Sequence, residues 1–262
     1  MRPMGLSSRL DAVFRTTLGL LVIPPTAIAM SLCALFRALR GAPRPKIDSV
    51  YSSFGRFALW VLGTRLEVRG LENIRPGQGY VLVPNHESNW DPPALLAALQ
   101  GIPVRFIVKK EIADIPIFGW AVIRTGSVRV ERTGDQSDVD RIREKMGTRP
   151  RDTSMLFYAE GSRSRDGALH PFKKGAFATA IAHRLPVLPI GHAGCYRIWK
   201  PNRFGLRSGP VVVEVGRPIP AEQLGYDDRE KLRDQTFDAV RELRTRARRR
   251  LRELGVDPGG ID

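Results

Sequence analysis

Cysteine is scarce in this sequence, and no group of residues has the spacing of a structural metal site. Only two cysteines occur among 262 residues: Cys33 lies inside an apolar run, and Cys195 lies far from it. This pattern disfavours a structural disulfide and fits a reducing compartment. No Cys/His cluster has zinc-ligand spacing, so we expect no metal and no bound cofactor.

Acidic residues are also few relative to basic ones. The chain has 27 Asp and Glu against 42 Lys and Arg, which gives a formal net charge of +15. Such an excess favours anionic partners: nucleic acid, an acidic membrane surface, a phosphorylated substrate or an acidic carrier protein. Charge alone does not choose among these four classes.

Internal repeats and low-complexity linkers are absent as well. The 42% hydrophobic and 26% charged residues are typical of a folded chain, and the length suits one large domain plus an attachment element. We therefore expect N-terminal membrane-attachment helices over residues 1–63 and a globular domain over residues 64–262. A charged helix over residues 227–254, containing the basic run RARRRLR, ends this domain.

Residues 17–36 form a long apolar stretch without charge. Arginines flank it on both sides: Arg9, Arg15, Arg37 and Arg40. Its length is just enough to span a bilayer core, but Pro24 and Pro25 near its middle predict a broken helix. Basic residues on both sides favour a helix–break–helix hairpin that enters one leaflet, with both ends cytoplasmic. A single span, and a signal peptide or buried helix, are the alternatives.

A second apolar helix is expected after this segment. Residues 41–45 (GAPRP) form a cluster of helix breakers. In residues 47–63, apolar side chains such as Phe54, Phe57 and Val61 recur at a spacing that approximates one helical face. This face either packs on the core or lies on lipid.

From residue 65 onward, short apolar runs alternate with helical patterns. Strands are predicted over residues 65–69, 80–84, 105–108, 127–130, 155–158, 187–190 and 211–215. Helices are predicted from residue 93 to 99 and over residues 138–147, 174–183 and 227–254. This alternation predicts an α/β fold with a mixed central β-sheet flanked by helices.

The strongest chemical signal is residues 83–93 (VPNHESNWDPP), where an apolar strand meets the start of a helix. On a regular helix, His86 and Asp91 would point about 140° apart, so they can meet only if the segment is a turn. Asp91 is a natural N-cap and Pro92 a natural first helical residue. His86 would then lie over the cap, with its Nδ1–H donated to Asp91.

An imidazole that a carboxylate holds in one tautomer can accept a proton from an alcohol. The simpler alternative is that Asp91 only caps a helix and His86 only fills a loop. A metal site at this pair lacks a third ligand nearby in the sequence. The other histidines (His170, His183 and His192) have no carboxylate at a suggestive spacing and are expected to be structural or surface residues. Nothing supports Cys195 as a nucleophile.

Further sequence blocks follow in a fixed order. They are Lys109 to Ile112 with Gly119-Trp120, then GSVRVER (126–132), FYAEGSRS (157–164), FKKG (172–175) and LPVLP (185–189). Together with residues 83–93, they resemble the bacterial 1-acylglycerol-3-phosphate acyltransferases, a glycerolipid acyltransferase family whose hallmark is His-x4-Asp. The resemblance covers roughly residues 65–220. Ala159, Ser162 and Glu131 stand where the family usually has proline, threonine and aspartate, and the charged groups are kept.

The resemblance implies roles for individual residues. His86 would be the catalytic base and Asp91 its carboxylate partner. Arg132 and Arg163 would form the acceptor phosphate site, because an arginine fork matches phosphate oxygens. The loop of that site would be shaped by Glu160, expected to orient an arginine, and by Gly161, which allows close backbone approach. Lys109 is an additional candidate phosphate cation.

The resemblance also implies a reaction and a location. A fatty acyl group would move from acyl-CoA or acyl carrier protein to the sn-2 hydroxyl of 1-acylglycerol-3-phosphate, giving phosphatidic acid. The enzyme would be bound to an anionic membrane, at the cytoplasmic face of the bacterial inner membrane. One alternative is another acceptor, such as a lyso-ornithine lipid. A nucleic-acid-binding protein is another, but no recognition-helix, zinc-finger or RNA-binding aromatic signature accompanies the basic tail.

Overall fold

A seven-stranded sheet organises the computed structural model, which describes residues 6–131 and 136–261. Its strands are β1 (Arg65–Arg69), β2 (Val81–Pro84), β3 (Val104–Lys109), β4 (Val128–Val130), β5 (Ser154–Leu156), β6 (Val187–Ala193) and β7 (Pro210–Val215). Their order across the sheet is β1-β7-β6-β2-β5-β3-β4. The β6–β7 pair is antiparallel and the other neighbours are parallel, so the predicted mixed sheet is confirmed.

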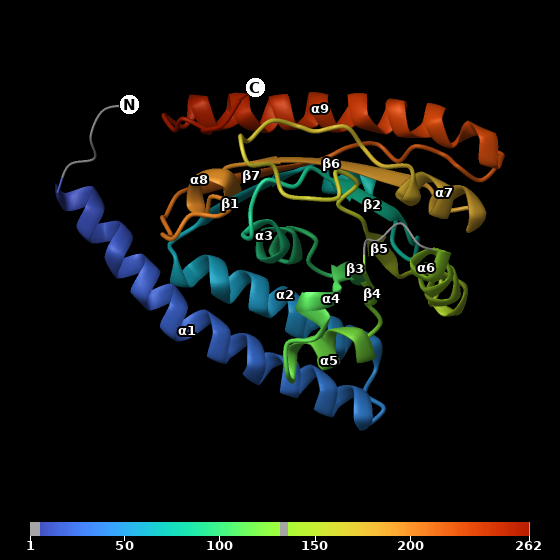
Figure 1. The fold of residues 1–262 in the computed structure, drawn as a ribbon, viewed down its shortest axis with the longest axis horizontal. Coiled ribbons are helices and arrows are strands. Elements are labelled where there is room, and N and C mark those ends of the chain that lie inside the picture. The colour runs from blue at the N-terminus through green and yellow to red at the C-terminus, as the bar shows by residue number, and fades with distance from the viewer. Residues whose placement is uncertain (1–5, 132–135, 262) are drawn as a thin grey trace.

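Helices cover both faces of this sheet (Figure 1). They are α1 (Leu6–Leu39), α2 (Arg44–Val61), α3 (Asp91–Ala98), α4 (Lys110–Ala113), α5 (Phe118–Arg124), α6 (Gln136–Thr148), α7 (Gly175–Ala182), α8 (Cys195–Ile198) and α9 (Arg229–Glu253), with 3₁₀ turns η1 (Leu71–Asn73) and η2 (Tyr226–Asp228). Helix α9 packs on β6 and β7, whereas α2 and α3 lie on the opposite side. The layer order is therefore helix, sheet, helix.

The central strand β2 is covered on both faces of the sheet. All four of its residues are buried. Leu82 belongs to the core cluster shared with α2 and α3, whereas Val81 and Val83 belong to the cluster shared with α7 and α9. Alternate side chains of a strand point to opposite faces, so a strand covered on both sides reads as a continuous apolar run.

Two strand boundaries differ from the prediction in ways that affect function. Strand β5 ends at Leu156, so Phe157 and Tyr158 enter the following loop instead of extending the strand. Strand β6 continues to Ala193, three residues beyond the predicted end, because Gly191 and His192 pair with β7. This extension brings His192 to the carboxyl end of β2.

Helix α1 is not broken at Pro24 and Pro25, contrary to the prediction. It is one continuous helix that includes both prolines, so the helix–break–helix prediction for residues 17–36 is wrong. Both prolines lie on the exposed face, where missing donors allow a helix to curve around the body it covers. The N-terminal hairpin does exist, but it is formed by α1 packed against α2.

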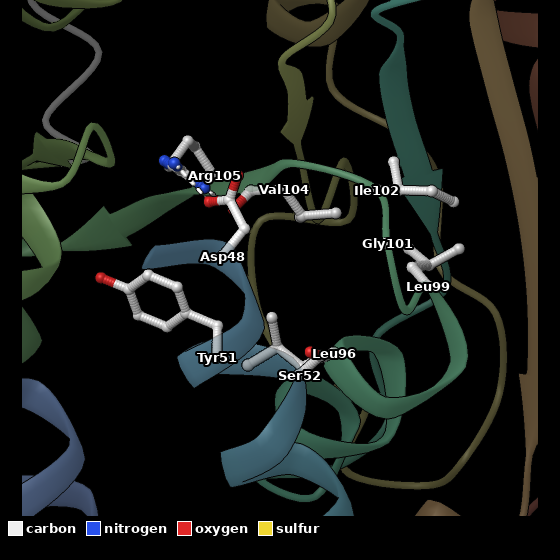
Figure 2. Close-up of a pocket in the computed structure, with 9 residues that line it drawn as sticks. All are labelled: Asp48, Tyr51, Ser52, Leu96, Leu99, Gly101, Ile102, Val104 and Arg105. Carbon is white, nitrogen blue, oxygen red and sulfur yellow. Dashed lines mark hydrogen bonds and ion pairs between the residues drawn. The ribbon is translucent and has the colours of Figure 1, made fainter. Parts of the chain in front are cut away.

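Helix α2 is joined to the globular body by buried polar contacts as well as by its apolar face. Asp48 forms a 2.6 Å ion pair with Arg105 of β3, and both side chains are nearly buried (Figure 2). The Tyr51 hydroxyl contacts the Thr125 hydroxyl at the end of α5. A Cβ on Gly55 would lie 2.6 Å from the backbone oxygen of Pro93, so α2 packs directly against the backbone of α3.

Helix α1 presents apolar side chains away from the protein. Among the residues that the structure describes, it is the one helix long and apolar enough to cross a membrane. Its exposed apolar side chains are Leu10, Val13, Phe14, Leu20, Leu21, Ile28, Leu32, Phe36 and Leu39. An apolar face of this size marks a surface that meets another apolar phase.

Candidate active site

The segment between β2 and α3, residues 85–91, is called the His86–Asp91 turn here. The Nδ1–H of His86 donates to Asp91 Oδ2 at 2.7 Å, as the spacing predicted. The same oxygen accepts the backbone N–H groups of Glu87 at 2.8 Å and Ser88 at 2.9 Å. Three donors therefore hold one carboxylate oxygen in place.

Asp91 is not the N-cap that the sequence predicted. Helix α3 begins at Asp91 itself, Trp90 precedes it, and prolines fill the first turn. Prolines offer no backbone N–H for a cap to accept. The Asp91 side chain is therefore directed back to the turn, where its donors lie.

Burial and stacking define the state of the His86 ring. The Asp91 side chain is fully buried, and that of His86 is 11% exposed. Burial lowers the pKa of His86, and the hydrogen bond to Asp91 opposes this effect. The Tyr158 ring stacks on the imidazole with centroids 3.6 Å apart. A neutral ring with its proton on Nδ1 presents the lone pair of Nε2 as a base.

His192 lies beside this pair, which the sequence analysis did not anticipate. Asn85 Oδ1 accepts the His192 backbone N–H at 2.8 Å, and the Nε2–H of His192 donates to the Asn85 carbonyl at 2.8 Å. His192 Nε2 is also 3.9 Å from Asp91 Oδ1, and its Nδ1 is 3.9 Å from Glu87 Oε1. His192 was expected to be a structural or surface residue, and its buried hydrogen bonds to Asn85 fit the structural role. Strand pairing nevertheless brings it near carboxylates about a hundred positions away, which its sequence spacing could not show. The apolar run that continues past residue 190 was the available signal.

Asp91, His192 and Cys195 place potential metal ligands within 4.8 Å of one another. Sequence spacing had offered no third ligand at this position. Burial and the Asp91 carboxylate raise the pKa of the Cys195 thiol well above its usual range, and His192 Nε2 already donates to a backbone carbonyl. A thiol that keeps its proton is a poor ligand, so the chemistry of this group favours hydrogen bonding over metal binding.

The segment after β5, residues 157–164, is called the Glu160 loop here. Glu160 Oε1 accepts the backbone N–H of His86 at 2.6 Å, and Oε2 accepts that of His170 at 2.9 Å. The Ser164 backbone N–H donates to the His86 carbonyl at 2.8 Å. Burial raises the pKa of Glu160 to about 8, against the effect of its two N–H donors. Glu160 therefore connects two loops through backbone N–H groups, and its predicted role in orienting an arginine stays a prediction because Arg132 lies outside the described residues.

Cations lie along the Glu160 loop. Arg163 donates to the Asn89 side-chain oxygen in the His86–Asp91 turn, and its charge lowers the pKa of His86. Gly161 has a φ of 79°, and a Cβ there would lie 2.7 Å from Lys173 Cε. The Lys173 side chain thus crosses the glycine, which adds a cation that the sequence analysis had not assigned to the site.

Lys109 is placed at the same edge of the sheet. It is the last residue of β3, pairs in register with Val130 and lies 2.6 Å from Glu111 in a solvent-exposed ion pair. Arg132 follows Val130 by two positions but lies outside the described residues. The structure therefore brings together His86, Asp91, Glu160, Gly161 and Arg163, with Lys109 at the carboxyl end of a strand on the same edge.

The C-terminal segment, residues 256–261, reaches the loop that follows Arg163. The Ile261 backbone N–H donates to the Asp166 carbonyl at 3.0 Å, and a Cβ on Gly260 would lie 2.7 Å from Gly167 Cα. Buried Arg244 of α9 donates to the carbonyls of both Ile261 and Gly167. The end of the chain is therefore packed against the extension of the Glu160 loop.

Comparison with known proteins gives these features a context. The family model described as Acyltransferase matches residues 65–193. The 1-acyl-sn-glycerol-3-phosphate acyltransferase of Pseudomonas aeruginosa is 31% identical over 218 residues, covering 80% of this chain and 82% of that protein. The human alpha enzyme of the same name is 31% identical, covering 72% of this chain and 68% of that protein. The chloroplastic BAT2 protein of Brassica napus is 38% identical, but the match covers only 45% of its length.

A solved structure agrees in fold. The crystal structure of the 1-acyl-sn-glycerophosphate acyltransferase PlsC from Thermotoga maritima matches with a TM-score of 0.78 and 23% identity, covering 90% of this chain and 95% of that one. The predicted fold class is thereby confirmed. With a 31% identical relative matched over 82% of its length, the chain belongs to the 1-acyl-sn-glycerol-3-phosphate acyltransferase family.

Proposed function

We propose that this protein transfers a fatty acyl group from acyl-CoA or acyl carrier protein to the sn-2 hydroxyl of 1-acylglycerol-3-phosphate, giving phosphatidic acid for phospholipid biosynthesis. The observation that carries the proposal is the 2.7 Å contact between His86 Nδ1 and the buried Asp91 carboxylate, beside Arg163. Relatives from Pseudomonas aeruginosa and human bear the name of this activity.

The mechanism is direct transfer by a general base. The acceptor hydroxyl gives its proton to His86 Nε2 as its oxygen attacks the thioester carbonyl. Asp91 stabilises the imidazolium, and backbone donors stabilise the tetrahedral oxyanion. When the intermediate collapses, the thiol leaves with the proton from His86. Because burial lowers the pKa of His86, the ring is neutral and ready to act as a base at neutral pH.

Arg163, Arg132 and Lys109 are proposed to bind the acceptor phosphate. Arg163 is attached to the His86–Asp91 turn through Asn89, so a phosphate bound there holds the hydroxyl near the base. Gly161 and Glu160 give the loop its shape, through a left-handed backbone position and two backbone hydrogen bonds. Positioning of this kind converts binding energy into rate.

Membrane attachment is proposed through α1, at the cytoplasmic face of the inner membrane. Arg15 donates to the Leu62 carbonyl, and Thr16 accepts the Leu206 backbone N–H, so the amino-terminal half of α1 is attached to the globular body. A helix held in this way cannot cross a bilayer alone, which favours burial of its apolar face in one leaflet. The anionic surface of that leaflet suits the net charge of +15, and we propose no nucleic-acid partner.

A lysolipid panel tests this function. The full chain, reconstituted in vesicles, is given acyl-CoA or acyl carrier protein and one acceptor at a time: 1-acylglycerol-3-phosphate, a lysophosphatidylcholine or a lyso-ornithine lipid. We expect phosphatidic acid to form at least about tenfold faster than any other product, because a phosphate monoester accepts several charge-assisted hydrogen bonds. Faster acylation of the phosphate-free lyso-ornithine lipid would reject the proposed acceptor and leave the His86 chemistry open.

A further inference from the structure

The loop between α8 and β7, residues 199–209, is called the basic loop here. It contains Lys200, Arg203 and Arg207 and no carboxylate, and it lies within residues 167–213, which contain no Asp or Glu. At its tip, Phe204 is 89% exposed, compared with 69% for Leu21 on the apolar face of α1. A single exposed aromatic between cations is the composition of a segment that binds at a membrane interface.

The position of the basic loop is as informative as its composition. The Leu206 backbone N–H donates to Thr16 Oγ1 of α1 at 2.8 Å. A Cβ on Gly19 would lie 2.5 Å from Leu206 Cδ1, so this glycine lets the loop pack directly on the helix. In Figure 1 the orange loop beside α8 faces the amino-terminal half of α1. The basic loop therefore packs against the covered side of α1, next to the helix whose outer face exposes apolar side chains.

The same loop also contacts the His86–Asp91 turn. The Ser88 hydroxyl of the His86–Asp91 turn donates to the Trp199 carbonyl at 2.7 Å. Ser88 also uses its backbone N–H to hold Asp91. The basic loop thus connects the apolar helix at one end to the catalytic turn at the other.

The cations of the basic loop lie close enough to repel one another. Burial, and then the charges of Arg203 and Arg207, lower the pKa of Lys200, whose ammonium lies over the Tyr196 ring. Mutual repulsion of this kind is relieved when anions approach. Lipid phosphates supply such anions at the depth where an adjacent aromatic ring enters the leaflet.

We propose that the basic loop is a second membrane-contact element, in which Phe204 enters the leaflet that holds α1 while Lys200, Arg203 and Arg207 bind anionic lipid headgroups. This proposal rests on the proposed attachment of α1. Such a contact would fix the depth of the active site relative to the membrane. The hydrogen bond between Ser88 and Trp199 would hold His86 at the level of the headgroups, where the acceptor hydroxyl lies. Continuity with α1 and charge complementarity favour a bilayer over an acidic protein as the partner.

Depth-dependent quenching tests the proposal without needing activity. In a Cys33→Ser background, Phe204→Cys is labelled with an environment-sensitive dye, and the full chain is reconstituted in vesicles containing nitroxide lipids. Leu21→Cys on α1 is the positive control. Tyr226→Cys is the negative control because Tyr226 is 64% exposed in η2, which directly precedes α9 and packs against it. We expect blue-shifted, quenched emission at positions 21 and 204 and neither effect at position 226.

The outcomes of this experiment separate the two proposals. Quenching at position 21 with water-like emission at 204 would overturn the role of the loop and leave the attachment of α1 intact. Water-like emission at both positions would overturn the attachment as well. Equal quenching at 204 and 226 would also reject a specific contact by the loop.

A charge variant tests the headgroup contact. Lys200→Gln with Arg203→Gln should reduce the preference for anionic over neutral vesicles about tenfold, because each cation near such a surface contributes to binding. Lys231→Gln with Arg249→Gln removes the same charge from exposed positions of α9 and should change the preference less than twofold. If the loop variant keeps its vesicle preference but loses activity with acyl carrier protein in detergent, the loop binds an acidic protein and the proposal fails.

Discussion

The His86–Asp91 turn and helix α1 are stabilised in opposite ways. In the turn, the fully buried Asp91 carboxylate accepts three hydrogen bonds from residues next to it. Helix α1 is much longer, and most of its apolar side chains are exposed. The turn is held by contacts inside the protein, whereas the outer face of α1 needs an apolar phase that the protein does not supply.

This difference predicts that single substitutions have larger effects in the turn than along α1. A group in the turn has few substitutes, because several hydrogen bonds depend on the same buried atoms, which are shielded from water. Along α1 the free energy gained by burying apolar surface is distributed over many similar side chains. A single substitution therefore removes only a small part of it. The predictions below run from the turn outward, in order of decreasing effect.

Loss of the base should have the largest effect. His86→Ala should reduce kcat by about 10²–10⁴-fold or more, because no other group can take the hydroxyl proton at that point. Steady-state acylation of 1-acylglycerol-3-phosphate measures the effect, and circular dichroism checks folding. His183→Ala, at the end of α7, is the matched control and should retain activity. Near-normal turnover by His86→Ala would rule out the base mechanism.

Arg163 belongs to the rim of the site and should affect binding more than chemistry. Arg163→Ala should raise the acceptor KM at least about tenfold, with a smaller change in the donor KM, because charge-assisted hydrogen bonds to phosphate are lost. Arg163→Lys should restore only part of the affinity, since an ammonium lacks the bidentate fork. Arg165→Ala is the control, because its exposed side chain lies two residues away. Equal KM values for both variants would show that Arg163 does not bind the acceptor.

The C-terminal segment should tune the Glu160 loop from a distance. Gly260 has a φ of 71°, and a methyl group there would collide with Gly167. Gly260→Ala should therefore raise the acceptor KM about threefold to tenfold with little change in kcat, because the loop shifts while the turn does not. Gly147→Ala, with nothing within 4 Å of the added methyl, is the control. A fall in kcat at constant KM would contradict this assignment.

The pH profile should report the balance of forces on His86. Burial lowers its pKa and Asp91 raises it. Because the base must be unprotonated, the acid limb of kcat/KM should lie below the usual pKa of histidine, about 6.5. Asp91→Asn should reduce the rate and move this limb to still lower pH, since the opposing carboxylate charge is removed. If the acid limb of Asp91→Asn moved to higher pH, the titrating group would not be His86.

The prolines of α1 should have the smallest effect. Pro24→Ala with Pro25→Ala restores two backbone donors within a continuous helix, so the thermal midpoint should rise by about 4 °C or more while activity changes less than twofold. Thermal unfolding in detergent measures this. A lower midpoint would mean that the prolines form a needed turn, as the sequence alone had suggested.

Local patterns predicted much of this architecture. The predicted first strand, residues 65–69, matches β1, and the alternation of strands and helices gave the correct fold class. The His86–Asp91 contact was also predicted, because it forms within one short turn. The division into residues 1–63 and 64–262 and the roles of the site residues stay predictions.

Apart from the N-cap at Asp91, what the sequence did not predict depends on contacts between distant segments. The Pro24–Pro25 rule is local, but α1 packs against α2 and α5, and this packing can offset the cost of two prolines. The two backbone N–H donors of Glu160 were not predicted, because they come from segments distant in the sequence. His192 was set aside because its carboxylate neighbours are distant in sequence.

The sequence by itself determined the alternating elements, the excess of positive charge and the His-x4-Asp turn, since each depends on residues close together along the chain. Only the tertiary structure decided that His192 lies beside Asp91, that the C-terminal segment packs on the residues after the Glu160 loop and that the basic loop lies on α1. These contacts join segments separated by up to 190 residues. Sheet order and helix packing decide which distant segments meet, and no local pattern encodes either.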